Sequence, residues 1–243
     1  MILENKVAFI TGAGGGIGRA TALALAKEGA RVVLFGGNNL QKLNETAQAI
    51  RALNIAEPLI FAGDLCDDKV MEDIFARAVS VVGSIDILIN NAGMALSSPF
   101  EQTDMAVFDK IMNINVRVPY KLTQLALPLL KQSQSASIIN LCSVVSHAGY
   151  ALQSAYTASK HALLGFTKSL ASEVYTSGIR VHAISPGGVY TDMVKVSRPD
   201  LTPDGMILPE DIAQIVMFFL SNRGNAVVDE ILVHRVNKAP FLV

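Results

Sequence analysis

The stretch TGAGGGIG at residues 11–18 carries five glycines in eight positions and follows a short apolar run, KVAFI at residues 6–10. Glycine loses more conformational freedom on folding than any other residue, so a run this rich in glycine is costly to order. A helical pattern of apolar residues begins at residues 17–28. The glycines therefore occupy a strand-to-helix turn, and this position indicates a role that offsets their cost.

The same alternation of short apolar runs and amphipathic stretches continues along the chain. We expect strands at residues 6–10, 31–35, 58–62, 85–90, 137–142, 180–185 and 230–234. We expect helices at residues 17–28, 40–53, 68–82, 104–131, 154–177 and 209–221. The strands are apolar almost throughout, which is typical of a sheet covered on both faces. The pattern predicts an α/β fold of the Rossmann type, with one doubly wound, seven-stranded parallel sheet and helices on both faces.

Residues 192–208 break this alternation, because Pro199, Pro203 and Gly205 interrupt any regular element there. In an open α/β sheet, the loops after the carboxyl ends of the strands form the ligand crevice. We therefore interpret residues 1–243 as a single domain with a substrate loop near 192–208.

Composition narrows the classes of function. The chain is 51% hydrophobic and its net charge is −1, which does not favour a nucleic-acid or membrane-surface partner. We expect no membrane span and no secretion signal, because apolar runs of the required length and flanking charge are missing. Cys66 and Cys142 form no CxxC pair, and the four histidines lack metal-ligand spacing. We therefore expect a cytoplasmic protein without a metal site.

Three of the glycines have separate expected uses. Gly12 permits a tight turn out of the strand, and Gly18 lets the helix pack close to the sheet. Gly16 lets the backbone approach a pyrophosphate, whose negative charge is favoured at a helix N-terminus. A merely flexible turn could have the same composition, but the flanking strand and helix favour nucleotide binding.

The spacing G-x-x-x-G-x-G resembles the cofactor loop of the classical short-chain dehydrogenase/reductase family, and further motifs follow in that family's order. They are Asp64-Leu65, Asn90-Asn91-Ala92-Gly93, Asn115, Ser143, Tyr156-x-x-x-Lys160 and Pro186-Gly187. The resemblance covers roughly residues 5 to 222, and the pattern is similar to 3-oxoacyl-carrier-protein reductase-like members. It implies an NAD(P)-dependent oxidoreductase that transfers a hydride between a nicotinamide cofactor and a carbonyl or secondary alcohol.

The resemblance also implies which residues hold the cofactor. They are Gly12, Gly14, Gly15, Gly16, Ile17, Gly18, Asn38, Asp64, Leu65, Asn91, Ala92, Gly93, Tyr156, Lys160, Pro186, Gly187, Val189 and Thr191. Asp64 is expected at the adenine and Thr191 at the nicotinamide carboxamide. A second interpretation stays open for Asp64, namely that it caps the helix that follows.

Tyr156 and Lys160 lie four residues apart in an expected helix, so their side chains share one face. Ser143 stands at the end of an apolar strand. A phenol with a pKa of about 10 can donate a proton to a carbonyl oxygen but is a poor base for the reverse reaction. We expect Tyr156 to be the general acid/base and Lys160 to lower its pKa. Ser143 is expected to position the substrate oxygen, and Lys160 by resemblance also holds the nicotinamide ribose.

Asn115 is the fourth catalytic residue by resemblance, which implies that its backbone carbonyl binds a water that relays protons to the lysine. Pro119 lies four residues later and has no N–H to donate to that carbonyl. We therefore hypothesise that Pro119 leaves the carbonyl free for this water. The alternative is that Pro119 only kinks the helix.

The end of the second strand does not decide the cofactor. In the family, an acid there binds the ribose 2′-hydroxyl and a base favours a 2′-phosphate. This chain has Phe35-Gly36-Gly37-Asn38-Asn39, and Gly15 in the glycine loop, so neither type is present. We expect NADP(H), because no acid repels the phosphate and Asn38 or Asn39 can bind it, while NAD(H) remains the alternative.

The expected substrate pocket runs over Met94, residues 143–153, Gly187-Gly188 and the 192–208 loop. His147 either contacts the substrate or is solvated, and both interpretations stay open. We interpret Cys142 as a buried strand residue rather than a nucleophile.

The partner is expected to be a small-molecule carbonyl or alcohol. Ser172 stands where carrier-protein reductases have a basic residue, so a carrier-protein substrate is not favoured. The long helices at 104–131 and 154–177 suggest a homodimer or homotetramer. A non-catalytic dinucleotide-binding regulator on the same fold and a nucleotide-sugar epimerase or dehydratase are the competing functions.

Overall fold

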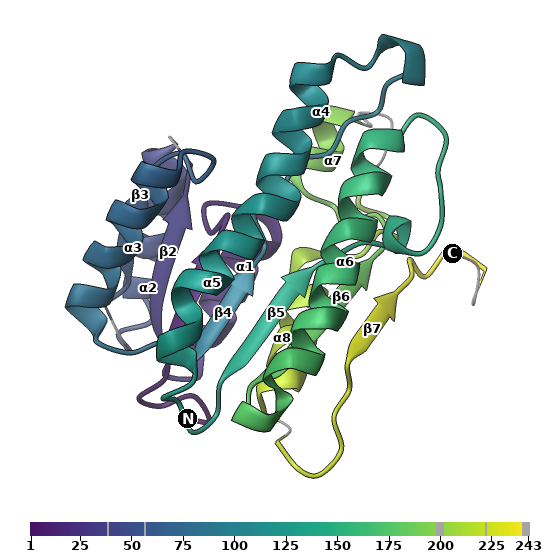
Figure 1. The fold of residues 1–243 in the computed structure, drawn as a ribbon. Coiled ribbons are helices and arrows are strands. Elements are labelled where there is room, and N and C mark those ends of the chain that lie inside the picture. The colour runs from purple at the N-terminus through teal and green to yellow at the C-terminus, as the bar shows by residue number, and fades with distance from the viewer. Residues whose placement is uncertain (38, 56, 198–201, 222, 240–243) are drawn as a thin grey trace.

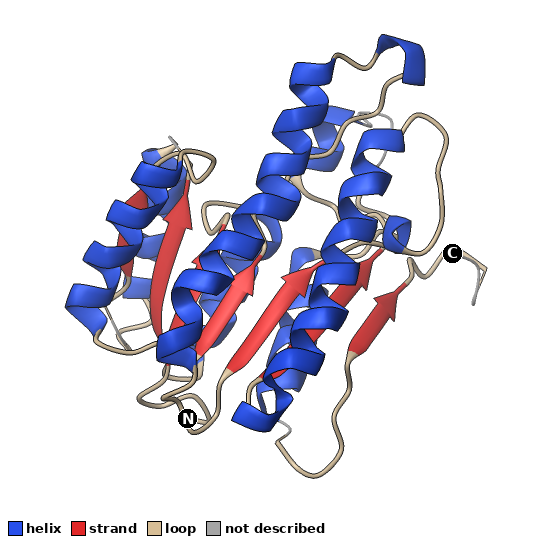
Figure 2. Cartoon of the chain, in the orientation of Figure 1, coloured by secondary structure: helices blue, strands red, loops and turns tan. Residues whose placement is uncertain are grey.

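The structure is a computed structural model that describes residues 1–37, 39–55, 57–197, 202–221 and 223–239. Seven parallel strands form one sheet in the order β3-β2-β1-β4-β5-β6-β7. Their bounds are β1 Val7–Thr11, β2 Arg31–Gly36, β3 Leu59–Ala62, β4 Ile87–Asn90, β5 Ser137–Leu141, β6 Arg180–Pro186 and β7 Glu230–Val233. The predicted Rossmann-type sheet is confirmed, and all the arrowheads point to one edge (Figure 2).

Helices cover both faces of this sheet (Figure 1). Their bounds are α1 Gly16–Lys27, α2 Leu40–Arg51, α3 Asp68–Val82, α4 Met105–Met112, α5 Val118–Leu130, α6 Ser154–Val174, α7 Asp192–Ser197 and α8 Pro209–Ser221. Buried side chains of α1, α2 and α8 form one apolar core against the sheet, and those of α3, α5 and α6 form a second core on the other face. Among the described residues, no helix is both long and apolar enough to cross a membrane.

Two sequence predictions need correction. The expected helix at 104–131 is divided, because a π-helical turn at Asn113–Arg117 separates α4 from α5. The Val118 N–H donates to the Asn113 carbonyl there, and Pro119, which cannot donate, stands next. The 192–208 segment is not wholly irregular, because α7 forms before the prolines; residues 198–201 of this segment lie outside the described residues.

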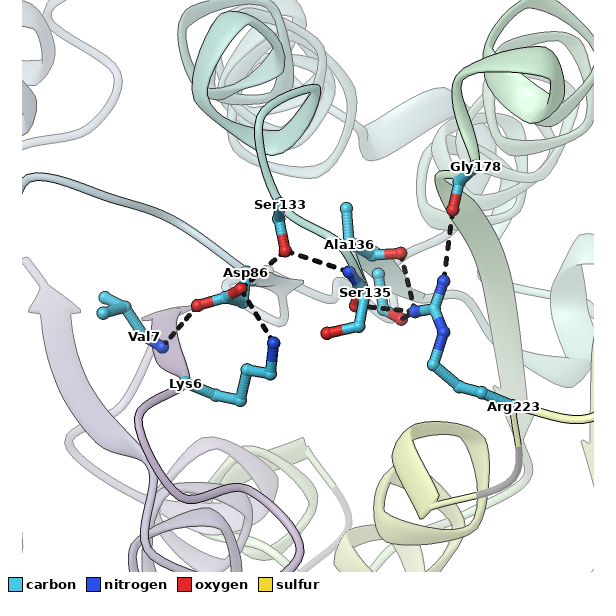
Figure 3. A network of polar contacts seen from close by, with 9 residues as sticks. Lys6, Val7, Asp86, Ser133, Ser135, Ala136, Gly178 and Arg223 are labelled. Atoms are coloured by element: carbon cyan, nitrogen blue, oxygen red, sulfur yellow. Dashed lines mark hydrogen bonds and ion pairs between the residues drawn. The ribbon is translucent and has the colours of Figure 1, made fainter.

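The amino ends of the central strands are joined by a polar network (Figure 3). Asp86, which precedes β4, accepts hydrogen bonds from the Val7 N–H at 2.9 Å and from the Ser133 hydroxyl at 2.5 Å. The Lys6 ammonium lies 3.3 Å from the same carboxylate. Arg223 completes the network by donating to Ser135, Ala136, Ser137 and Gly178. This end of the sheet is therefore built for stability, and the opposite edge is left for the site.

We predict that Asp86→Ala lowers the free energy of unfolding by about 2 kcal/mol, because the buried Val7 N–H loses its side-chain acceptor. Urea denaturation measures this change. At a temperature well below the melting transition, the turnover of the variant should stay within about twofold of the wild-type turnover, because Asp86 lies away from the cleft. Asp73→Ala, which removes an exposed aspartate of α3, is the matched control and should change stability by less than about 0.5 kcal/mol. A loss of activity without a loss of stability would contradict this separation.

Candidate active site

The glycine loop is packed as the sequence predicts. Gly12 has φ +67°, a left-handed conformation that glycine adopts without strain. A Cβ on Gly18 would overlap the Gly12 carbonyl oxygen and lie 2.6 Å from the Asn91 side-chain nitrogen. Gly16 also has a positive φ, +49°, and a Cβ there would lie 3.0 Å from the Thr191 methyl carbon. These contacts explain why the loop excludes larger residues.

Asn91 and Thr11 tie this loop to the end of β4. The Asn91 side chain donates to the carbonyls of Thr11 and Gly12, at 2.9 and 3.3 Å. The Thr11 hydroxyl in turn accepts from the N–H groups of Asn91 and Ala92, at 3.0 and 2.9 Å. The sequence placed Asn91 and Ala92 at the cofactor, and the structure shows in addition that Asn91 holds the loop in position.

The glycine loop opens onto a cleft of about 820 Å³ at the carboxyl edge of the sheet. The lining includes these predicted cofactor and catalytic residues: Gly12, Gly14, Gly15, Gly16, Ile17, Asn91, Ala92, Gly93, Ser143, Tyr156, Lys160, Pro186, Gly187, Val189 and Thr191. Apart from its own chain neighbours and helix backbone, no atom of the described residues lies within 4 Å of the position that a Cβ on Gly15 would take, so a side chain there would project into the cleft. Since the first N–H groups of α1 lack helical acceptors, this cradle fits a pyrophosphate.

Ser143, Tyr156 and Lys160 meet in the middle of this cleft. Ser143 is buried two residues after the end of β5, and its hydroxyl acts to lower the pKa of the Tyr156 phenol. The Lys160 ammonium is buried, donates to the Leu141 carbonyl at 2.6 Å and lies 5.8 Å from the centre of the Tyr156 ring. Helix α6 and strand β5 thus bring together the three groups that the sequence singled out.

Burial sets the protonation of this group. It raises the pKa of Tyr156 to about 12, against a smaller lowering by the Ser143 hydroxyl. It lowers the pKa of Lys160 to about 8. The prediction that Lys160 lowers the pKa of Tyr156 is therefore wrong for this structure, because the ammonium faces the Leu141 carbonyl and desolvation of the phenol dominates.

Asn115 connects the cleft to the π-helical turn. Its side chain is fully buried, accepts from the Met94 N–H at 2.8 Å, and donates to the Met94 carbonyl at 2.8 Å and the Ser159 hydroxyl at 2.9 Å. Ser159 in turn donates to the Tyr156 carbonyl at 2.7 Å. The side chain thus clamps the loop after β4 to α6, while the water relay through its backbone carbonyl stays a prediction.

Several predicted cofactor residues lie elsewhere. Asp64 is exposed and accepts from the Cys66 N–H at 2.9 Å, and the helix cap expected of it is Asp67, which accepts from two N–H groups of α3. Leu65 is buried in the core under α3. Neither residue is among those lining the cleft, and Asn38 lies outside the described residues.

Two residues near the expected substrate pocket are also clarified. His147 does not line the cleft, because its Nε2 pairs with Glu230 Oε1 at 2.7 Å. Cys142 is buried, and burial raises the pKa of its thiol to about 11, so it is poorly suited to be a nucleophile.

The sequence reasoning missed three basic residues that line the cleft, Lys42, Arg235 and Lys238. Lys42 lies in the first turn of α2, and a Cβ on Gly14 would be 3.1 Å from its Cβ. Arg235 follows β7 and packs against Gly188. The only signal in the sequence was the presence of basic residues shortly after two strand ends, which becomes informative once the strand order is known.

Comparison with known proteins identifies the relatives of this chain. Residues 6–202 match the short chain dehydrogenase family. The 3-oxoacyl-[acyl-carrier-protein] reductase FabG of Thermotoga maritima is 32% identical over 244 residues, which cover 96% of this chain and 97% of that protein. A short chain dehydrogenase structure from Shigella flexneri complexed with NADP has a TM-score of 0.88 and 31% identity, covering 96% and 98% of the two chains. A 3-ketoacyl-(acyl-carrier-protein) reductase structure from Brucella melitensis complexed with NADH has a TM-score of 0.84 and 30% identity, covering 96% and 97%.

The chain therefore belongs to the short chain dehydrogenase family. It is an NAD(P)-dependent oxidoreductase of the short-chain dehydrogenase/reductase type, and the alternative of a non-catalytic regulator is not supported.

The lowered pKa of Lys160 predicts how stability changes with pH. Between pH 8 and 10.5 the unfolded chain holds a proton on this amine that the folded chain has lost, so wild-type stability rises with pH in this window. Lys160→Met removes the effect. The free energy of unfolding of the variant minus that of the wild type should be about 2–3 kcal/mol larger at pH 7 than at pH 10.

Urea denaturation of both proteins at several pH values measures this difference. Lys168→Met, which removes an exposed lysine of the same helix, should show a difference that is constant with pH. A constant difference for Lys160→Met as well would show that the amine is not perturbed.

Proposed function

We propose that the protein interconverts a small-molecule carbonyl compound and its secondary alcohol, with Ser143, Tyr156, Lys160 and Asn115 as the catalytic residues. The observation that carries this proposal is that Ser143, Tyr156 and Lys160 line one cleft, where the Ser143 hydroxyl acts to lower the pKa of the Tyr156 phenol. A nicotinamide cofactor supplies or accepts the hydride when it is bound.

Each residue has a task that follows from its position. A substrate oxygen placed between Ser143 and Tyr156 accepts hydrogen bonds from both hydroxyls, which orients the carbonyl. The phenol then donates its proton to that oxygen as negative charge develops on it. Lys160 lies one helical turn after Tyr156 in α6, and its ammonium donates to the Leu141 carbonyl. From this position it can support proton return to the phenol. Asn115 fixes the loop that carries Met94 and so shapes the cleft wall.

We predict that Tyr156→Phe lowers kcat by at least about 100-fold, because the proton donor is lost. Cofactor binding, measured by titration calorimetry, should stay within about threefold, a change well below the 1.4 kcal/mol of a tenfold effect. Tyr175→Phe is the matched control, because this tyrosine is 71% exposed after α6 and should leave kcat unchanged. Full activity of Tyr156→Phe would refute the assignment. Consumption of free cofactor also separates this reaction from that of an epimerase.

We propose NADP(H) as the preferred cofactor, with NAD(H) as the alternative. Lys42 supports this preference, because it lines the cleft with Gly36, Gly37 and Asn39 at the end of β2. In dinucleotide-binding folds this place receives the adenosine ribose, and a base there accommodates a 2′-phosphate. Asp192 of α7 holds the Lys42 ammonium at 2.8 Å and raises its pKa, so the lysine stays charged.

We predict that Lys42→Met weakens NADPH binding about tenfold, the loss of one charge-assisted contact to phosphate. NADH binding should change less than about twofold, since it has no 2′-phosphate. Asp192→Asn should have the opposite sign and tighten NADPH binding, because it releases the lysine from its carboxylate partner. Calorimetry gives the dissociation constants of NADPH and NADH for each of the two variants and for the wild type. Equal effects of Lys42→Met on both cofactors would remove Lys42 from this role.

We further propose that residues 1–243 act as one catalytic domain in the cytoplasm, with the segment near 192–208 at the substrate. We also propose a homodimer or homotetramer built on α4, α5 and α6. An aromatic pair supports this surface, since Tyr120 is 55% exposed and its ring lies 4.9 Å from that of Phe166. Sedimentation velocity of the wild type and of Tyr120→Glu tests the assembly.

A further inference from the structure

The segment after β7 lies over the substrate side of the cleft. The Gly187 N–H donates to the Val233 carbonyl at 2.8 Å, which places the end of β7 beside the end of β6. A Cβ on Gly187 would lie 3.9 Å from Val144, the neighbour of Ser143. The segment then continues at the carboxyl edge of the sheet (Figure 1). Its cleft-lining residues are His234, Arg235, Lys238 and Ala239.

The side chain of Arg235 is held in a defined place. Its Cδ lies 3.6 Å from the position of a Cβ on Gly188, and its Nη1 lies 3.6 Å from Met206 Sδ. The Lys238 N–H donates to the Arg235 carbonyl at 3.0 Å and closes a turn. Because these contacts are to a glycine and a thioether, they position the guanidinium without neutralising it.

The charges around Arg235 are unbalanced. Among the described residues, no carboxylate oxygen lies within 4.0 Å of the Arg235 guanidinium, so this charge has no ion-pair partner there. The described cleft lining contains one carboxylate, Asp192, which pairs with Lys42 at 2.8 Å and Lys195 at 3.6 Å. A partly buried guanidinium in a cleft attracts anions more strongly than an exposed one, because its field is less screened.

We propose that the substrate is a ketone or secondary alcohol that carries a carboxylate, and that Arg235 binds this carboxylate. The inference rests on the proposed function, because it places the reacting oxygen between Ser143 and Tyr156. A guanidinium presents paired N–H donors that match the two oxygens of a carboxylate. Lys238 of the same segment also lines the cleft and adds to the positive charge that favours an anion there. Arg235 thereby determines specificity and does not take part in the chemistry.

The test compares each keto acid with its own methyl ester. The probes are acetoacetate and levulinate with methyl acetoacetate and methyl levulinate, assayed with NADPH and with NADH on the full chain. We expect wild-type kcat/KM for one acid to exceed that for its ester by at least about tenfold, the worth of one charge-assisted contact. Arg235→Met should abolish this preference by lowering kcat/KM for the acid, with the ester changed less than about threefold. Arg235→Lys should keep part of it, and Arg77→Met, which removes an exposed arginine of α3, should keep all of it.

The outcomes separate the inference from the proposed function. Turnover of the esters without an acid preference, or an equal loss for acid and ester in Arg235→Met, overturns the carboxylate site and leaves the oxidoreductase. No turnover of any probe counts against the proposed substrate class. In that case calorimetry of levulinate with the NADPH-bound protein decides the inference, because it needs no reaction. Levulinate binding by the wild type that is lost in Arg235→Met supports the inference. Equal binding by the two proteins, or no binding by the wild type, overturns it.

Discussion

The close approach of α1 to the ends of β1 and β4 is the constraint on which the rest of the site depends. It occurs at Gly18, where any Cβ would overlap the Gly12 carbonyl and the Asn91 side chain. The same Asn91 side chain binds the carbonyls of Thr11 and Gly12, so helix, loop and two strands meet at one point. This contact directs the amino end of α1 toward the cleft, where its free N–H groups favour an anion.

The catalytic residues depend on the same contact through a short chain of bonds. Asn91 begins the loop after β4. In that loop, the Asn115 side chain hydrogen-bonds to both the N–H and the carbonyl of Met94. Asn115 reaches α6 through Ser159, which bonds to the carbonyl of Tyr156. The cradle and the proton donor are therefore parts of one polar framework, and the distance between them is fixed by buried groups rather than by surface loops.

Much of this arrangement could be predicted from the sequence, because it follows from local patterns. Apolar runs identify the seven strands, and the glycine spacing identifies the turn that follows β1. What escaped prediction depends on tertiary structure. Lys42 reaches the cleft only because α2 packs against Gly14, and Arg235 does so only because β7 pairs in parallel with β6. Asp64 illustrates the opposite error, since a plausible cap in the sequence is three residues from the actual cap, Asp67.

The direction of the two pKa shifts bears on the chemistry. Burial acts on Tyr156 and Lys160 in opposite senses, because it disfavours a phenolate and an ammonium alike. At neutral pH the phenol is consequently protonated, which is the form that carbonyl reduction requires. Alcohol oxidation requires the phenolate, so it needs a positive charge brought closer to the oxygen than Lys160 now stands. A shift of this ammonium from the Leu141 carbonyl toward Tyr156 would supply that charge, and it requires the 2.6 Å hydrogen bond to that carbonyl to break.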